Sequence, residues 1–299
     1  GGQPRAGRPL MLSREAPAGV ERLFRTGGPF FLIAGPCLVE DDRLNLTVAE
    51  ELARISEDLR LPIVFKASFD KANRSRIDSP RGPGLEEGLR RLARVREATG
   101  LPVLTDVHEP WQAQPAADVC DALQIPAFLC RQTDLVTAVA ATGRPVNIKK
   151  GQWMAPEEMA GAVGKARAAG ANAVTVTERG TFHGYGDLVV DMRSFARMRE
   201  ATGAPAIFDG THSVQRPGRA DGSSGGDPEF VPPLVRAAVA AGADGLFLEV
   251  HPDPARAPSD GTNMLRLDRL RPLLETVLAI REAVAGDPVG AGPREARGA

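Results

Sequence analysis

The sequence lacks long hydrophobic runs and carries almost no net charge, and each absence excludes a class of protein. No apolar run approaches the roughly 20 residues of a membrane-spanning helix, and residues 1–28 lack the apolar middle of a secretory signal. The formal net charge of -1 does not provide the broad basic face that a nucleic-acid partner requires. We therefore predict a cytoplasmic protein that binds neither membranes nor nucleic acid, so that local clusters of cations must serve a small ligand.

Cysteine is also scarce, with three residues in a chain of 299. An odd number of widely spaced cysteines does not suit a disulfide scaffold, which leaves each thiol free for burial or metal binding. We expect Cys120 and Cys130 to be buried and inert. Apolar residues make up 42% of the chain and charged residues 25%, as is typical of a soluble globular protein.

From residue 29 to about 285, short β-rich apolar runs alternate with segments of helical periodicity. About eight such units predict a single (β/α)8 TIM barrel, flanked by a flexible extension at residues 1–28 and a disordered tail at residues 286–299. A doubly wound open sheet is the alternative, but no G-x-G-x-x-G motif follows the first run. The predicted strands cover residues 30–35, 61–67, 101–107, 121–127, 144–150, 172–178, 204–210 and 244–250.

Glycines often follow the predicted helices directly before the next strand. A glycine at this position can adopt the left-handed conformation that ends a helix. The pattern predicts short connections at one end of the barrel. These glycines are Gly100, Gly143, Gly170, Gly203 and Gly242.

The opposite ends of the predicted strands carry polar residues. In a (β/α)8 barrel, the carboxyl ends of the strands and the loops after them form the active site. Charged side chains that converge there need substrates or ions to balance them. The sequence therefore predicts a catalytic rim formed by Cys37, Lys66, Asp106, His108, Gln124, Arg131, Lys149, Lys150, Glu178, Arg179, Asp209, His212, Glu249 and His251.

Cations occupy one half of this rim, beginning with the segment KASFDKANRS at residues 66–75. Lys and Arg donate charge-assisted hydrogen bonds to phosphate and carboxylate groups, and Ser68, Asn73 and Ser75 add neutral donors. One phosphate carries close to two negative charges, so this much positive charge indicates two phosphates, or a phosphate and a carboxylate. The cations are Lys66, Lys71, Arg74, Arg131, Lys149 and Arg179.

Potential metal ligands occupy the other half. Cys37 follows the first strand, and His212 and Glu249 lie near the ends of the last two, which become neighbours of the first when the barrel closes. Asp260, in the loop after the last strand, completes the set. One thiolate, one imidazole and two carboxylates suit a borderline or first-row divalent metal ion rather than calcium or magnesium. Inert burial is the alternative interpretation of Cys37.

Seven distinctive segments occur between residues 30 and 285, in this order: FKASFDKANRS, RGPGLEEGL, TDVHEP, QAQPAADV, QIPAFLCRQTDL, LVVDMRSF and THSVQ. Together they resemble the 3-deoxy-D-manno-octulosonate 8-phosphate synthase family. The resemblance implies a (β/α)8 barrel, usually a homotetramer, that condenses phosphoenolpyruvate with D-arabinose 5-phosphate and water and releases inorganic phosphate. This reaction lies on the route to the Kdo sugar of lipopolysaccharide.

The resemblance also implies roles for individual residues. Family members with a Cys after the first strand need a divalent metal such as zinc, iron or manganese, and the expected ligands are Cys37, His212, Glu249 and Asp260. The expected catalytic residues are Lys66, Lys71, Asp106, His108 and Lys149. The expected substrate-binding residues are Ser68, Asn73, Arg74, Ser75, Gln124, Arg131 and Arg179, with Asn73 and Arg74 at the pentose phosphate.

Three alternative functions remain open at this point. A 3-deoxy-D-arabino-heptulosonate 7-phosphate synthase would use erythrose 4-phosphate and typically has KPRTS where this chain has KANRS. A class II aldolase would not need a second anion pocket, and a protein that only binds sugar phosphates would not convert them to product.

The chain also departs from the family with HGYGD at residues 183–187 in place of a segment like FGYNN. Residues 216–230 are predicted to form a mobile lid.

Overall fold

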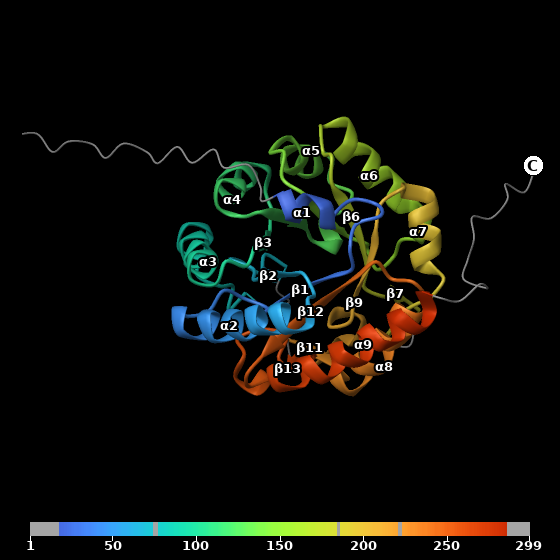
Figure 1. Cartoon of the computed structure of the whole chain (residues 1–299). Coiled ribbons are helices and arrows are strands. Elements are labelled where there is room, and N and C mark those ends of the chain that lie inside the picture. The colour runs from blue at the N-terminus through green and yellow to red at the C-terminus, as the bar shows by residue number, and fades with distance from the viewer. Residues whose placement is uncertain (1–17, 74–76, 184–185, 221–222, 286–299) are drawn as a thin grey trace, which may run out of the picture.

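Eight parallel strands close into a barrel in this computed structural model, which describes residues 18–73, 77–183, 186–220 and 223–285 (Figure 1). The barrel closes where Leu32 pairs with Leu246. The predicted strands and the single (β/α)8 barrel are confirmed, and the open sheet is excluded. The strands are β1 (Phe31–Gly35), β2 (Ile63–Lys66), β3 (Val103–Asp106), β4 (Ala122–Ile125), β5 (Val146–Lys149), β6 (Val174–Glu178), β9 (Ala206–Asp209) and β12 (Gly245–His251).

Helices surround the strands because each buries an apolar face against them (Figure 1). In α2, for example, Val48, Leu52 and Ile55 recur at helical spacing and are buried. No helix among the described residues has the length and apolar character to span a bilayer. The helices are α1 (Ala18–Leu23), α2 (Asp42–Leu59), α3 (Leu85–Thr99), α4 (Ala113–Val119), α5 (Thr133–Ala141), α6 (Met159–Ala168), α7 (Ser194–Thr202), α8 (Val231–Ala240) and α9 (Leu270–Ala285). Short 3-10 helices are η1 (Pro110–Gln112), η2 (Ala127–Leu129), η3 (Pro156–Glu158), η4 (His212–Val214), η5 (Pro228–Phe230), η6 (Pro254–Arg256) and η7 (Leu267–Arg269).

The glycines predicted to end helices have left-handed backbones. Gly100 caps α3 at φ 72°, and Gly203 caps α7 at φ 62°. Gly143, Gly170 and Gly242 also have positive φ, each one residue beyond a helix cap. These residues turn the chain into the next strand, so the prediction of short connections on this side is confirmed.

Helix α1 closes the end of the barrel at which the strands begin. Leu23 and Phe24 are buried in one cluster with side chains of the barrel interior, and the rings of Phe24 and Phe31 lie 5.5 Å apart. The packed part of the chain therefore starts before the predicted boundary at residue 29. The remainder of the predicted extension, residues 1–17, and the predicted tail, residues 286–299, lie outside the described residues.

Small strands extend from the opposite end. β7 (Thr181–Phe182) pairs with β8 (Leu188–Val189), and β10 (Gln215–Ala220) pairs with β11 (Ser223–Gly226). β13 (Leu265–Arg266) adds a short parallel pairing to β12. The β10–β11 hairpin occupies much of the segment predicted as a lid, so that segment has regular structure next to the carboxyl ends of the barrel strands.

Candidate active site

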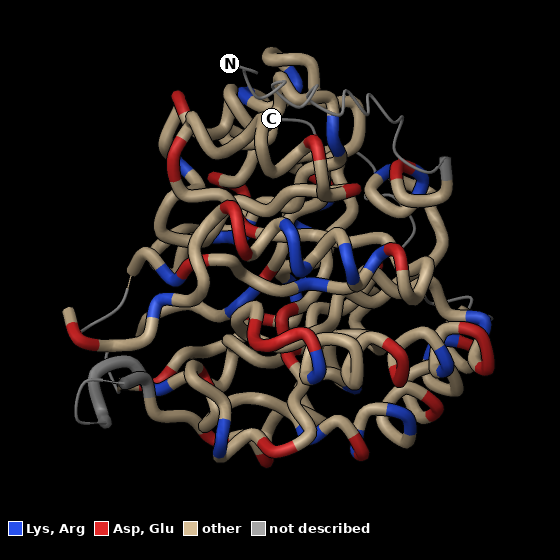
Figure 2. The backbone as a smooth tube through the Cα atoms, turned by 90° about the vertical axis from the view of Figure 1, so that its left-hand side faces the viewer, with Lys and Arg blue, Asp and Glu red and all other residues tan. Residues whose placement is uncertain are grey.

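A cavity of about 1020 Å³ lies at the carboxyl ends of the barrel strands. Basic and acidic residues lie close to one another in the body of the molecule as well as on its outside (Figure 2). The cavity collects much of the predicted rim into one site. The predicted catalytic, substrate-binding and metal residues on its lining are Lys66, Lys71, Asn73, Asp106, His108, Gln124, Lys149, Arg179, His212 and Asp260.

Two lysines share the carboxylate of Glu249. Lys66 Nζ lies 2.9 Å from Glu249 Oε1 and donates also to the carbonyl oxygen of Cys37, while Lys71 Nζ lies 3.8 Å from Glu249 Oε1. Burial by itself would raise the pKa of Glu249, but the charges of Lys66 and His212 outweigh it and lower that pKa. Burial also disfavours the ammonium of Lys71, yet the nearby Glu249 carboxylate holds the pKa of Lys71 well above the usual value. Glu249 and Lys71 are therefore charged.

Asp209 contacts Lys149 on one side and His212 on the other. Lys149 Nζ donates to Asp209 Oδ2, and His212 Nδ1 lies 2.7 Å from the same oxygen. Because the carboxylate can only accept, a neutral His212 carries its proton on Nδ1 and presents the lone pair of Nε2, which lies 3.7 Å from Glu249 Oε1. Burial lowers the pKa of Lys149 to about 8, although Asp209 opposes the shift. Lys149 is thus a cation that can release its proton near neutral pH.

Asp106 orients Ser68 and His108. Ser68 Oγ donates to Asp106 Oδ1, and His108 Nε2 lies 3.1 Å from Asp106 Oδ2. Burial would raise the pKa of Asp106, but the hydrogen bond from His108 and the charge of Lys66 hold it well below its usual range. His108 Nδ1 is buried and has no hydrogen-bond partner among the described residues. This nitrogen is free to bond a ligand.

Arg179 retains an unused donor, and Gln124 has a fixed orientation. Arg179 Nη2 donates to Gln215 Oε1 at 2.6 Å, while Arg179 Nη1 is buried without a hydrogen-bond partner in the described part of the chain. Gln124, which lies on the cavity lining, is oriented by Asn147, whose Nδ2 donates to Gln124 Oε1 at 2.9 Å. A buried guanidinium with an unused donor suits a phosphate or a carboxylate.

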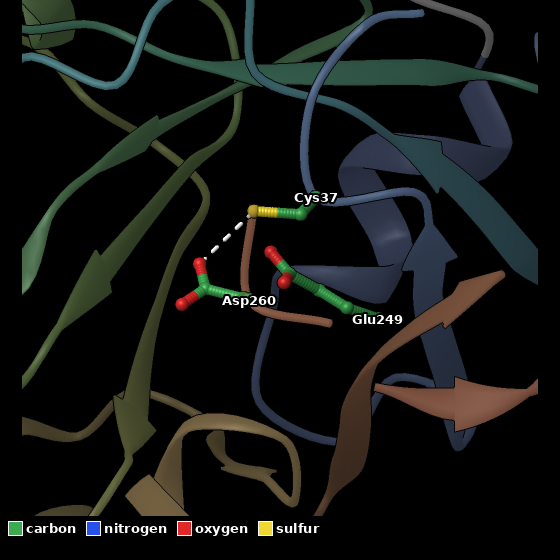
Figure 3. Close-up of side chains that lie close together, drawn as sticks. All are labelled: Cys37, Glu249 and Asp260. Atoms are coloured by element: carbon green, nitrogen blue, oxygen red, sulfur yellow. Dashed lines mark hydrogen bonds between the residues drawn. The ribbon is translucent and has the colours of Figure 1, made fainter. Parts of the chain in front are cut away.

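Cys37, Glu249 and Asp260 point toward one another (Figure 3). Of the three, Asp260 is on the cavity lining, while Cys37 and Glu249 are buried beside it. One ligand atom from each lies within 4.8 Å of the others, and Cys37 Sγ lies 3.0 Å from Asp260 Oδ2. Burial raises the pKa of the Cys37 thiol, and Asp260 and Glu249 raise it further. Glu249 Oε2 is buried and has no hydrogen-bond partner among the described residues. These donors fit a divalent ion of the zinc or first-row kind, whose charge would favour the thiolate.

His212 is not in this tight group, but its surroundings are those of a metal ligand. Its Nδ1 is oriented by Asp209, a carboxylate–histidine arrangement that recurs in metal sites and aims the other ring nitrogen at the metal. That other nitrogen lies on the side of Glu249. The four predicted ligands therefore occupy one sector of the site.

Comparison with known proteins agrees with this chemistry. The sequence profile of the DAHP synthetase I family matches residues 19–285. The chain is 56% identical over 265 residues to a 2-dehydro-3-deoxyphosphooctonate aldolase of Alkalilimnicola ehrlichii, covering 88% of this chain and 95% of the relative. Proteins of the same name from Desulfotalea psychrophila, 53% identical over 268 residues (90% and 95%), and Koribacter versatilis, 56% over 262 (86% and 94%), are also similar.

The chain belongs to the 2-dehydro-3-deoxyphosphooctonate aldolase family. This is the octulosonate 8-phosphate synthase family that the sequence motifs resemble, so that prediction is confirmed. The names of the relatives support the octulosonate synthase rather than the heptulosonate alternative. The members of this family are enzymes, which argues against the alternative that this chain only binds sugar phosphates.

Some residues expected in the aldolase site lie elsewhere or outside the described residues. Arg131 is exposed and is not on the cavity lining; its carbonyl oxygen accepts from Lys165 Nζ at 2.9 Å. Arg74 and Ser75 fall outside the described residues. Ser68 is buried behind Asp106 rather than on the lining.

Cys120 and Cys130 are buried, and neither joins the Cys37 cluster, in agreement with the expected inert role. His251 is buried at the end of β12 and lies 3.2 Å from Glu40. It is not on the cavity lining. In the HGYGD segment, for which the sequence predicts a departure from the family pattern, His183 is exposed and Asp187 lies 3.3 Å from Arg216.

Gln215 is a site residue that was not predicted from the sequence. Gln215 lines the cavity and bonds both Arg179 and Asp260. A signal was present, because Gln215 follows His212 by three residues and ends the aldolase-like segment THSVQ. An uncharged side chain at the start of a Gly-rich stretch does not by itself indicate an ion site, and its partners lie far away in the sequence.

Proposed function

We propose that this protein condenses phosphoenolpyruvate with D-arabinose 5-phosphate and water to give 3-deoxy-D-manno-octulosonate 8-phosphate and inorganic phosphate. The observation that carries the proposal is a single cavity in which buried cations adjoin the Cys37–Glu249–Asp260 cluster. The names of the relatives support the same reaction. A binding site for a single anion would need neither this number of cations nor a set of metal ligands beside them.

Lys66, Lys149 and Arg179 are suited to the phosphate and carboxylate of phosphoenolpyruvate. All three are buried, so their charges act in a medium of low polarity where an anion is attracted strongly. The unused Nη1 donor of Arg179 and the amide nitrogen of Gln124 add hydrogen bonds of defined direction. We assign Arg131 to the same substrate by resemblance alone, because it is exposed and outside the cavity lining.

The sugar phosphate is assigned to the outer part of the cavity. Asn73 is exposed and lies on the cavity lining, next to residues 74–76, which are outside the described part of the chain. Arg74 and Ser75 are therefore assigned by resemblance, as donors to the pentose phosphate. Separation of the two phosphates keeps their negative charges apart while C3 of phosphoenolpyruvate faces the aldehyde.

Cys37, His212, Glu249 and Asp260 would hold a divalent metal ion such as zinc, iron or manganese. When bound, such an ion supplies a Lewis acid that can polarise an oxygen of the substrate or of water. The protein's own contribution is orientation: Asp209 sets the His212 ring, and Lys66 keeps Glu249 charged.

The reaction joins C3 of phosphoenolpyruvate to the aldehyde carbon, adds water at C2 and then breaks the bond between C2 and the phosphate oxygen. Negative charge develops on the aldehyde oxygen and positive charge at C2. Lys149, whose pKa is about 8, can donate a proton near neutral pH. Asp106 is charged and positions His108, so that a neutral His108 carries its proton on Nε2 and its free Nδ1 can accept from a substrate hydroxyl, while Lys66 and Lys71 provide fixed positive charge.

We also propose that the protein is a homotetramer that acts in the cytoplasm in lipopolysaccharide biosynthesis. Exposed aromatic residues support an assembly: Phe128 and Trp153 stack with their ring centroids 6.0 Å apart, although 49% and 44% of their surfaces are exposed. Exposed apolar patches of this kind often mark contacts between subunits.

The deciding experiment is an assay of phosphate release from phosphoenolpyruvate with a panel of sugar phosphates. We expect turnover with arabinose 5-phosphate and little with erythrose 4-phosphate. Preferential turnover of the four-carbon sugar would support the heptulosonate reaction instead, and release that needs no sugar would contradict a condensing enzyme.

A further inference from the structure

Gln215, the first residue of β10, lies between the two halves of the cavity. Its Oε1 accepts from Arg179 Nη2 at 2.6 Å, and its Nε2 donates to Asp260 Oδ1 at 3.3 Å. The other oxygen of Asp260 accepts from Cys37 Sγ at 3.0 Å. A single side chain therefore connects a cation at the end of β6 to a carboxylate of the metal cluster.

The bridge requires an amide. Only Asn and Gln combine a carbonyl acceptor, which suits the guanidinium of Arg179, with an NH2 donor, which suits the carboxylate of Asp260. A glutamate at this position would keep the bond to Arg179 but would add a third carboxylate beside Asp260 and Glu249. A methionine would have a similar length and make neither bond.

Both partners of Gln215 depend on outside contacts for their orientation. Asp260 lies in a loop, with φ at 51° in the left-handed region that non-glycine residues adopt at a cost. The carboxylate of Asp260 is oriented by Cys37, Gln215 and Ser259, whose Oγ lies 3.2 Å from Asp260 Oδ2. Arg179 uses Nη2 for Gln215, which leaves Nη1 as its unused donor.

We propose that Gln215 is a positioning residue that couples the phosphate-binding side of the cavity to its metal-binding side. The proposal rests on the function proposed above for those two sides. An anion on Arg179 holds the guanidinium, and with it the amide, in the orientation that also places Asp260 for a metal ion. Because coupling between sites is reciprocal, each ligand then strengthens binding of the other.

The test is binding of Mn²⁺ and of phosphoenolpyruvate to the full-length Gln215→Met variant by titration calorimetry. We expect affinity for Mn²⁺ to fall about 10-fold, as for other residues that orient a metal ligand. Affinity for phosphoenolpyruvate should fall roughly 3- to 10-fold, because Arg179 keeps its contact with the ligand but loses the one hydrogen bond from Gln215 that orients it. Phosphoenolpyruvate should also improve Mn²⁺ binding less in the variant than in the wild type.

Gln114→Met is the matched control, because Gln114 on α4 also donates an amide hydrogen bond to a carboxylate, that of Asp118 at 2.8 Å, far from the cavity. Both affinities of this control should stay within about twofold of the wild type. Loss of only one affinity in Gln215→Met, or of neither, would overturn the coupling. If the methionine variant does not fold, Gln215→Asn, which keeps the amide but is too short to span both partners, must show the same double loss.

A second readout does not depend on the proposed function. Hydrogen exchange in the ligand-free protein should become faster in Gln215→Met both in the segment that holds Arg179 and in the loop that holds Asp260, and unchanged exchange would count against the bridge. If the wild type itself binds neither Mn²⁺ nor phosphoenolpyruvate, the proposed function fails, and hydrogen exchange alone decides whether Gln215 couples the two segments.

Discussion

Lys66 and Glu249 form an ion pair, with 2.9 Å between Nζ and Oε1, in which both side chains are almost wholly buried. The same carboxylate belongs to the Cys37–Glu249–Asp260 cluster. Glu249 is therefore shared between the substrate cations and the metal ligands. The arrangement keeps this carboxylate balanced by a lysine even without a metal ion, so Glu249 does not need the metal to compensate its charge.

The first prediction follows from that balance. EDTA should abolish turnover while the protein stays folded, because Lys66 and Lys71 continue to compensate Glu249 after the metal leaves. Zinc, manganese or ferrous iron should restore activity. The measurements are phosphate release, metal content by elemental analysis and the thermal unfolding temperature. Full activity in protein shown to be metal-free would refute a metal requirement.

A second prediction concerns Cys37. Cys37→Asn should weaken metal binding sharply, because an amide oxygen is a much poorer ligand than a thiolate for zinc or iron. Some metal-independent turnover should remain, unlike in metal-stripped wild type, because the Asn amide can hydrogen-bond in the space that the metal occupied while the cations align both substrates. The family that the sequence resembles also includes members with Asn at this position. Turnover in chelator is compared with that of Cys37→Ala. Two equally inactive variants would show that the metal carries chemistry that this scaffold cannot replace.

The pKa of Lys149 predicts the pH dependence of substrate capture. Lys149 is a cation below its pKa of about 8 and neutral above it. Because a neutral amine does not attract an anion, kcat/KM for phosphoenolpyruvate should fall as the pH rises through about 8. Binding of phosphoenolpyruvate to Lys149→Met should be weaker and should lack this decline. A wild-type kcat/KM that stays constant between about pH 7 and pH 9, the range that spans the pKa of Lys149, would contradict a role of this cation in substrate binding.

Lys150 gives a prediction about stability. Its Nζ is fully buried and contacts Thr181 Oγ1 at 3.1 Å, the Gly151 and Met154 carbonyl oxygens at 3.2 and 3.3 Å, and Glu178 Oε1 at 3.5 Å. Lys150→Met should lower the free energy of unfolding by about 3 kcal/mol, because it leaves the buried Glu178 carboxylate without its cation.

Chemical denaturation at matched protein concentration measures the effect of Lys150→Met. Lys165→Met is the control, since Lys165 is only partly buried and donates to a single carbonyl oxygen. The control should cost less than about 1 kcal/mol. Equal losses of unfolding free energy in the two variants would mean that the buried contacts of Lys150 do not stabilise the protein more than the single contact of Lys165.

The strands could be predicted because their apolar runs are continuous and are bounded by glycine or proline. The run at residues 61–67, for example, contains β2, whose last residue, Lys66, reaches the cavity. Parallel strands of a barrel are buried on both faces, so their sequences show the core directly. The same reasoning placed Cys37 and Glu249 together, since barrel closure pairs β1 with β12.

Other features could not be predicted because they depend on contacts between distant segments. Nothing local to Leu23 and Phe24 indicates that they pack inside the barrel rather than precede it. Lys150 was predicted to belong to the catalytic rim because it is charged and follows a strand. Its side chain instead points toward Glu178 and the loop carbonyl oxygens. Arg131 was assigned to the cavity from its segment, yet its own side chain is exposed in the chain described here.

The packing of α1 has a consequence for the order of events during turnover. Phe24 packs against Phe31 at one end, and Asn147 bonds Thr175 and Thr177 of the neighbouring strand, so side chains of the described residues fill the barrel interior. We therefore expect both reactants to arrive, and both products to depart, at the carboxyl ends of the strands, where the cavity lies. A reactant bound near the buried Lys149 lies deeper than one bound near the exposed Asn73. We expect the outer reactant to cover the inner one, and therefore expect sequential addition with the deeper reactant first.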